Sequence, residues 1–188
     1  MLNINNVCFQ QGDFRLTADF LVPTGARVAV IGPSGGGKST FLNGIAGFIA
    51  TDVGQILWAD KPMADHPGQR PLSILFQDHN LFPHLSVMDN VAVGISPNMR
   101  LSHSQRHAVS VALGKVGLAD KSASFPRDLS GGQQGRVGLA RVLLRQRPLL
   151  LLDEPFSALG PALKDEMLDV LSGILDDTGA TALMVTHD

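Results

Sequence analysis

Residues 32–40 read Gly32-Pro33-Ser34-Gly35-Gly36-Gly37-Lys38-Ser39-Thr40. The apolar run before them, residues 27–31, predicts a buried strand, and residues 41–47 predict a helix that begins at about Lys38. Glycines allow backbone conformations in which several N–H groups point at one anion, and the helix N-terminus adds its positive dipole end. Strand, glycine-rich turn and helix in this order are typical of the P-loop, G-x-x-x-x-G-K-[ST], so the sequence predicts nucleotide binding by residues 32–40.

Two side chains of this loop carry the expected chemistry. Lys38 supplies a mobile cation for the outer phosphates, and the Ser39 hydroxyl is a ligand for Mg²⁺. The plainer alternative is a glycine-rich turn that contains a lysine by chance. The strand before the loop and the helix after it favour the nucleotide site, although the loop alone does not say what the nucleotide is for.

The composition describes an ordinary globular chain. Its 188 residues suit one domain, or one domain with an inserted subdomain. The formal net charge of −2 gives no indication of a nucleic-acid partner, and Arg141 and Arg145 indicate a charged helix face. The single cysteine, Cys8, excludes an internal disulfide framework. No apolar run approaches the roughly 20 residues of a membrane span, so we expect the chain to reach a membrane only through a partner.

The first two thirds of the chain change character near residue 80. Apolar residues predict strands near residues 2–7 and 16–22 and shorter strands at 54–58 and 72–76. From about residue 80 to residue 130 the apolar spacing becomes helical. The pattern predicts a helical insertion in an α/β domain.

The last third returns to alternating helices and strands. Residues 137–144 predict a largely buried helix, and residues 163–174 predict an amphipathic one. The leucines at 149–152 are too few for a membrane span and predict a central parallel strand. Residues 181–185 predict the last strand.

Two acidic residues follow the leucines directly. Asp153 and Glu154 stand where the strand ends, and open α/β sheets bind their ligands at the carboxyl ends of strands. We expect Asp153 to hold the Mg²⁺ that Ser39 also touches, and Glu154 to orient and polarise the attacking water. The alternative is a pair of solvated turn carboxylates.

Residues 129–133 read Leu129-Ser130-Gly131-Gly132-Gln133. A serine and two glycines that open a helix predict a second anion-binding helix N-terminus. A nucleotide seated in residues 32–40 has no evident need of a second cradle from the same chain. We therefore expect Ser130, Gly131, Gly132 and Gln133 to close over the nucleotide of a partner molecule.

These motifs in this order resemble the ATP-binding subunits of ABC transporters, and the resemblance runs nearly end to end. The P-loop, Gln77 in the Q-loop position, the signature at 129–133, the pair Asp153-Glu154 and His187 in the H-loop position all match. The resemblance implies an α/β P-loop ATPase with a mostly parallel central sheet, an antiparallel β subdomain and a helical insertion. It also implies that Gln77 senses Mg²⁺ and the attacking water, and that His187 contacts the γ-phosphate.

The resemblance further implies a domain plan and partners. A single ATPase domain would span residues 1–188, with a core at about 1–78 and 131–188 and a helical subdomain at about 79–130. Relatives continue past this point, so the domain is expected to be C-terminally short. Two copies would form a head-to-tail homodimer around two ATP, and the helical subdomain would meet integral membrane permease subunits.

Within the family, residues 70–85 and 153–159 are most similar to the ATP-binding subunits of bacterial thiamine importers. This likeness implies import of thiamine or a related small nutrient, with a periplasmic solute-binding protein as an indirect partner. It places the chain peripherally on the cytoplasmic face of the inner membrane, with no nucleic-acid partner. Importers of iron, an anion or a polyamine are the alternatives.

Two positions depart from the family pattern. Gln11 stands near the place of an aromatic residue that stacks on adenine, which leaves Phe9 or Phe14 as substitutes. Gly160 stands where the family has an aspartate that helps link the two sites of the dimer. These departures keep a second hypothesis open: a truncated or degenerate module that binds nucleotide without turnover.

Overall fold

The structure, a computed structural model, describes residues 1–157 and 159–187. Ala158, part of one stretch on which the family resemblance was based, and Asp188, the end of the predicted domain, lie outside these residues. The chain forms two compact units. The first unit comprises Met1–Ile74, Arg147–Glu154 and Gly179–Asp188, and the second comprises Leu75–Gln146 and Pro155–Thr178. This grouping places residues 131–146 and 155–178 with the helical segment, so the predicted division into core and helical subdomain stays a prediction.

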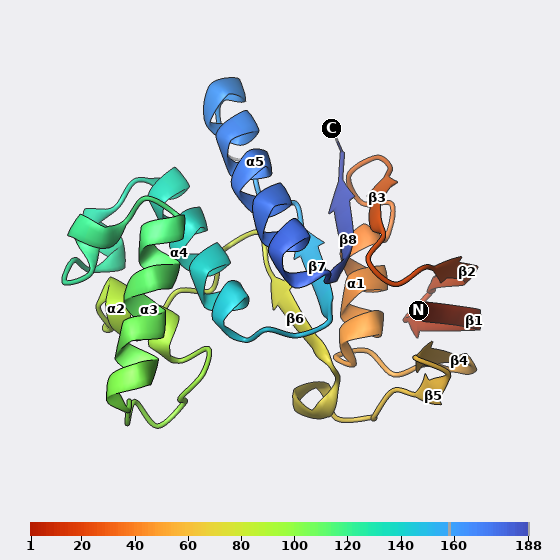
Figure 1. Ribbon diagram of the computed structural model, residues 1–188. Coiled ribbons are helices and arrows are strands. Elements are labelled where there is room, and N and C mark those ends of the chain that lie inside the picture. Colours follow the sequence, from red (N-terminus) through yellow and green to blue (C-terminus); the bar gives the residue numbers. More distant parts are fainter. Residues whose placement is uncertain (158, 188) are drawn as a thin grey trace. The chain divides into compact units, whose positions relative to one another are not determined.

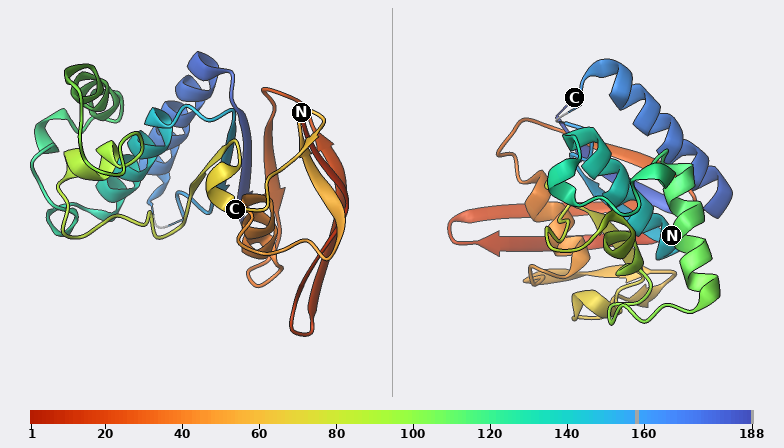
Figure 2. Two further views of the ribbon diagram at one scale, coloured as in Figure 1. Left: turned by 90° about the horizontal axis from the view of Figure 1, so that it is seen from below. Right: turned by 90° about the vertical axis from the view of Figure 1, so that its left-hand side faces the viewer.

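An antiparallel sheet forms one part of the first unit. Its strand order is β2-β1-β4-β5, and β1 pairs antiparallel with both β2 and β4. The β1–β2 hairpin extends as a long two-stranded ribbon (Figure 2). The strand bounds are β1 (Leu2–Gln11), β2 (Phe14–Val22), β4 (Val53–Trp58) and β5 (Lys61–Pro62). The expected strands near residues 2–7, 16–22 and 54–58 are confirmed.

A second sheet of the first unit has the order β3-β8-β7-β6. Its strands are β3 (Arg27–Ile31), β6 (Leu72–Leu75), β7 (Leu149–Asp153) and β8 (Thr181–Thr186). Both β3 and β7 run parallel to β8, and all five residues of β7 are buried, as its leucines predicted. In the register, Ile31 pairs with Thr186 and Asp153 with Val185. Residues that follow these strands therefore emerge at one edge of the sheet.

The expectation that β3 is buried is wrong. Arg27, Ala29 and Ile31 are exposed, and Ile31 keeps 69% of its surface accessible. The reason is position: β3 is the edge strand of its sheet and pairs only with β8 in the described sheet order. Only the face that carries Val28 and Val30 packs against the core.

Helix α1 (Lys38–Ala46) lies between the two sheets of the first unit (Figure 1) and packs against core residues of both. Its Phe41, Leu42 and Ile45 share one cluster with Ile4 of β1 and Leu151 of β7. Burial of these side chains at about 1.5–3 kcal/mol each fixes the helix. Because the helix begins directly after the glycine-rich loop, this packing also fixes the loop's position on the first unit.

The second unit is helical. Helices α2, α3 and α4 share a core formed by side chains such as Val91, Val109 and Val137, and Val170 of α5 packs against it. The helix bounds are α2 (Val87–Ala92), α3 (His103–Lys115), α4 (Gly131–Leu144) and α5 (Pro161–Thr178), and short 3₁₀ turns lie at Ala119–Lys121 and Pro126–Asp128. The predicted helical insertion and the two later helices are confirmed. Within the described part of the chain, no helix combines the length and apolarity needed to cross a bilayer.

Candidate nucleotide-binding and catalytic site

The glycine-rich loop connects β3 to α1 as the sequence predicted. Gly35 and Gly37 have φ angles of 78° and 84°, in the left-handed region that side chains disfavour. Gly37 is the N-cap of α1, and no side chain caps this helix end. The first N–H groups of α1 therefore remain available to an anion, and the helix dipole favours one there.

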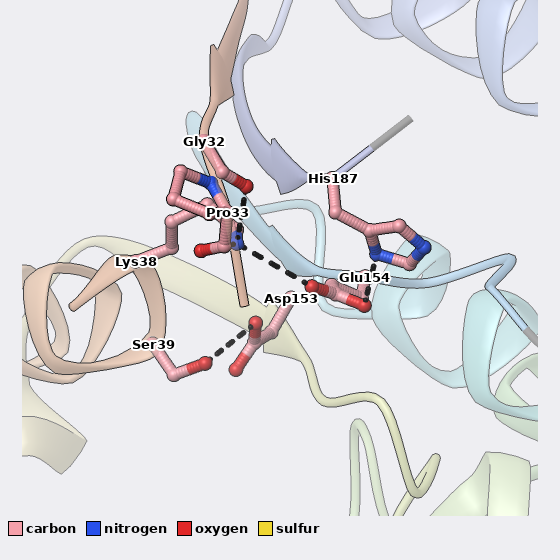
Figure 3. Close-up of polar contacts among 7 residues, drawn as sticks. All are labelled: Gly32, Pro33, Lys38, Ser39, Asp153, Glu154 and His187. Carbon is pink, nitrogen blue, oxygen red and sulfur yellow. Dashed lines mark hydrogen bonds and ion pairs between the residues drawn. The ribbon is translucent and has the colours of Figure 1, made fainter. Parts of the chain in front are cut away.

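The ammonium group of Lys38 is enclosed by the loop itself. Its Nζ donates hydrogen bonds to the carbonyl oxygens of Gly32, at 2.8 Å, and Pro33, at 2.9 Å (Figure 3). It also lies 3.7 Å from Oε1 of Glu154, and the residue is buried. The cation is thus held at the loop, where bound phosphate groups would meet it.

Ser39 and Asp153 form a pair of oxygen atoms beside the loop. The Ser39 hydroxyl donates to Oδ1 of Asp153 at 3.1 Å. Burial raises the pKa of Asp153, and Glu154 adds to this rise, whereas the Ser39 hydrogen bond and Lys38 oppose it. Among the residues described, no group of three His, Cys, Asp or Glu side chains could hold a metal alone. Two hard oxygens fit Mg²⁺, which usually completes its coordination with phosphate oxygens and water.

Glu154 is held between two basic side chains. Its Oε2 lies 2.8 Å from Nδ1 of His187, opposite the oxygen that faces Lys38 (Figure 3). Its backbone has a φ of 42°, which is uncommon for a residue with a side chain, and its N–H donates to the carbonyl of Val185. Such backbone strain is found most often at functional sites. The parallel register of β7 and β8 brings Glu154 and His187 together although 33 positions separate them.

The signature residues and Gln77 belong to the second unit. Ser130 is the N-cap of α4, and its Oγ accepts from the backbone N–H of Gln133 at 3.3 Å. The Ser130 N–H in turn donates to Oε1 of Gln133 at 3.0 Å, which completes a capping box. Gly131 is exposed, while Gly132 is covered by Leu163 of α5. Gln77 is exposed in the turn after β6.

Phe14, one of the two phenylalanines that the sequence offered in place of the aromatic residue expected near Gln11, lies beside the glycine-rich loop. A Cβ atom at Gly37 would lie 2.5 Å from Cζ of Phe14, so the Phe14 ring lies directly against the end of the loop. Phe14 is 40% exposed, whereas Phe9 is fully buried. The sequence did not decide which of these two phenylalanines takes the place of the missing aromatic residue, and their difference in burial distinguishes them. Of the two, only Phe14 combines exposure with a place beside the glycine-rich loop.

These features define a class. A glycine-rich loop between a parallel strand and a helix, with a buried lysine and an acidic pair at the end of a neighbouring strand, forms a P-loop nucleotide-binding domain.

Comparison with known proteins identifies the family within this class. The family profile described as ABC transporter matches residues 17–157. The thiamine import ATP-binding protein ThiQ of Cereibacter sphaeroides is 57% identical over 100% of this chain and 82% of its own length. The protein of the same name from Jannaschia sp. strain CCS1 is 52% identical over the same shares. A dimeric ATP-binding cassette, MJ0796 bound to ADP and Pi, superposes with a TM-score of 0.86 at 28% identity, over 100% of this chain and 88% of that one.

The chain belongs to the ABC transporter family of ATP-binding proteins. It binds ATP and is an ATPase subunit, and the resemblance and the α/β fold class expected from the sequence are confirmed.

Proposed function

We propose that this chain hydrolyses ATP to drive an importer of thiamine or a closely related nutrient. The position of Glu154, between His187 and Lys38 at the glycine-rich loop, supports the hydrolytic part of the proposal. The names of relatives at 57% and 52% identity support the choice of solute. No feature of the described residues favours iron, an anion or a polyamine instead.

The residues of the first unit would divide the reaction among them. Lys38 and the loop amides would stabilise the charge that develops on the γ-phosphate. Mg²⁺, held by Ser39 and Asp153, would neutralise phosphate charge when bound. Glu154 would orient the attacking water and accept its proton, while His187 would hold the Glu154 carboxylate and contact the γ-phosphate. Gln77, on the second unit, would sense Mg²⁺ and the attacking water.

The assembly we propose is a head-to-tail homodimer around two ATP. Ser130, Gly131, Gly132 and Gln133 of one copy would complete the phosphate site of the other, since the α4 N-terminus presents N–H groups and a dipole suited to an anion. Integral membrane permease subunits would bind the dimer at the cytoplasmic face of the inner membrane. A periplasmic solute-binding protein would act through the permease.

Uptake of labelled thiamine tests this function. The gene would be expressed in a Cereibacter sphaeroides strain that lacks its own thiamine import ATP-binding protein. We expect the wild-type chain to restore uptake and the Glu154→Gln variant to fail at equal expression. Absent rescue by a chain that hydrolyses ATP would contradict the thiamine assignment. Uptake assays with labelled iron, phosphate and putrescine would then test the other importers.

Replacement of Phe14 by serine is expected to weaken ATP binding. Loss of base stacking costs about 1–2 kcal/mol, which corresponds to a roughly fivefold to thirtyfold rise in Kd. Titration calorimetry with ATP and with inorganic triphosphate measures the effect. Phe48→Ser, at an exposed phenylalanine beyond the far end of α1, is the matched control. Equal losses for ATP and triphosphate would show that Phe14 does not meet the base.

A further inference from the structure

We propose that Arg141 and His79 are positioning residues that hold the turn at residues 77–80, called the Gln77 loop below, against helix α4. The loop and the signature residues 130–133 would then move as one body during ATP hydrolysis. All of these residues lie in the second unit. The inference rests on the proposed function, because it concerns how Gln77 and the signature residues act together.

Arg141 joins α4 to the loop with two hydrogen bonds. Its Nη2 donates to the carbonyl oxygen of His79 at 2.5 Å, and its Nη1 donates to that of Asn80 at 2.8 Å. A guanidinium group has parallel donors in a fixed fork, so it holds both carbonyls in one orientation. The sequence indicated that Arg141 lies on an ordinary charged face; instead the side chain is half-buried and tied to the loop.

The Gln77 loop needs the two Arg141 hydrogen bonds because its backbone is strained. His79 and Asn80 have φ angles of 56° and 44°, so two consecutive residues with side chains occupy the left-handed region. Histidine and asparagine tolerate this region better than most residues, yet it persists only where the surroundings impose it. The two carbonyls that Arg141 binds belong to these same two residues.

Two glycines of α4 make the close approach possible. A Cβ at Gly135 would lie 3.3 Å from Cε1 of the His79 ring, and one at Gly138 would lie 2.8 Å from Cδ1 of Leu75. Gly135 and Gly138 are three residues apart and therefore on one side of the helix. Leu75 at the end of β6 and the His79 ring thus lie against the part of α4 where these two positions carry no side chain.

The His79 ring is half-buried against α4. Its Nδ1 is buried and has no hydrogen-bond partner in the described part of the chain. Burial lowers the pKa of His79 from its usual 6.5 and Arg141 lowers it further, while Asp78 opposes them.

The consequence follows from the continuity of α4. The helix runs without interruption over Gly131–Leu144, so the signature residues at its start and Arg141 in its last turn share one rigid rod. A shift of the signature residues therefore carries the two carbonyls, and with them Gln77 two residues earlier.

The test compares Arg141→Lys with Arg106→Lys, the same exchange at an exposed position of α3. A lysine ammonium lacks the planar fork, so it does not fix the two carbonyls in one orientation. We expect kcat for ATP to fall about tenfold, since small misplacements of catalytic groups are costly, while KM stays within twofold. His79→Asn, which keeps a residue tolerant of the left-handed region, should act in the same direction. Thermal melting confirms that each variant is folded.

Hydrogen exchange supplies a readout that does not need turnover. In Arg141→Lys, exchange should rise in peptides that cover 76–82 and 130–136 and stay constant in the peptide that covers 32–40. The inference is overturned if folded variants keep kcat within twofold of wild type, or if only one of the two segments responds. A wild-type chain without turnover would instead contradict the proposed function, and hydrogen exchange would still decide this inference.

Discussion

Replacement of Glu154 by glutamine is expected to lower ATP turnover at least a hundredfold and to leave ATP binding unchanged. A general base contributes roughly 10²–10⁴-fold, and an amide cannot accept the proton of the attacking water. The P-loop does not depend on this carboxylate, because Lys38 also bonds to the carbonyls of Gly32 and Pro33. Steady-state phosphate release and equilibrium ATP binding, measured on one preparation, separate the two effects.

Glu166→Gln is the matched control. Glu166 lies on α5 and pairs with Arg136 at 2.8 Å in the second unit, so its loss removes an ion pair without touching the first unit. We expect turnover of this variant to remain near that of wild type. If Glu154→Gln hydrolysed ATP at a comparable rate, another group would have to act as the base. If the wild-type chain showed no turnover, the hypothesis of a module that binds nucleotide without hydrolysis would gain support.

Replacement of Gly54 by alanine is expected to lower the free energy of unfolding by about 3 kcal/mol or more. Gly54 has a φ of 81°, and a Cβ there would overlap the backbone oxygens of Asn5 and Asn6. The register of β1 against β4 shifts between Asn5 and Cys8, so Gly54 accommodates an irregular stretch of β1. Backbone atoms of a paired strand cannot move aside as a flexible side chain would. Urea unfolding, followed by circular dichroism, measures the loss.

Gly114→Ala provides the opposite expectation from the same chemical change. Gly114 is exposed in α3, and a Cβ there meets nothing within 4 Å. Alanine should raise the free energy of unfolding by about 0.5–1 kcal/mol, because glycine is costly inside a helix. If both variants changed the free energy of unfolding by similarly small amounts, the backbones of β1 and β4 would have to move apart at Gly54 to admit the new Cβ atom.

Much of the site was predictable because its parts are local or set by strand order. The P-loop is a continuous stretch whose glycines and lysine together indicate phosphate binding. Asp153 and Glu154 follow an apolar strand, and parallel strands bring their carboxyl ends to one edge. The contact between Glu154 and His187 then follows from the register of β7 and β8.

Other features depend on neighbours that a sequence does not name. Four of the five residues of β3 are apolar, as in a buried strand, but only the sheet order shows that β3 lies at an edge. Phe9 and Phe14 are the same residue type on adjoining strands, and only packing decides which ring meets the loop. Arg141 has the sequence context of a surface residue, yet its partners are carbonyls about 60 residues away.

The strand order has a consequence for synthesis on the ribosome. Strand β8 is the last described strand in the chain, yet it pairs with both β3 and β7 in the sheet. Until it arrives, a nascent chain carries two strands whose inner edges lack a partner, and such edges invite aggregation. Pairing across this separation is also slow, because loop closure must precede the contacts that reward it. The nucleotide site thus forms only after nearly all described residues have been translated, and ATP cannot stabilise the protein before then.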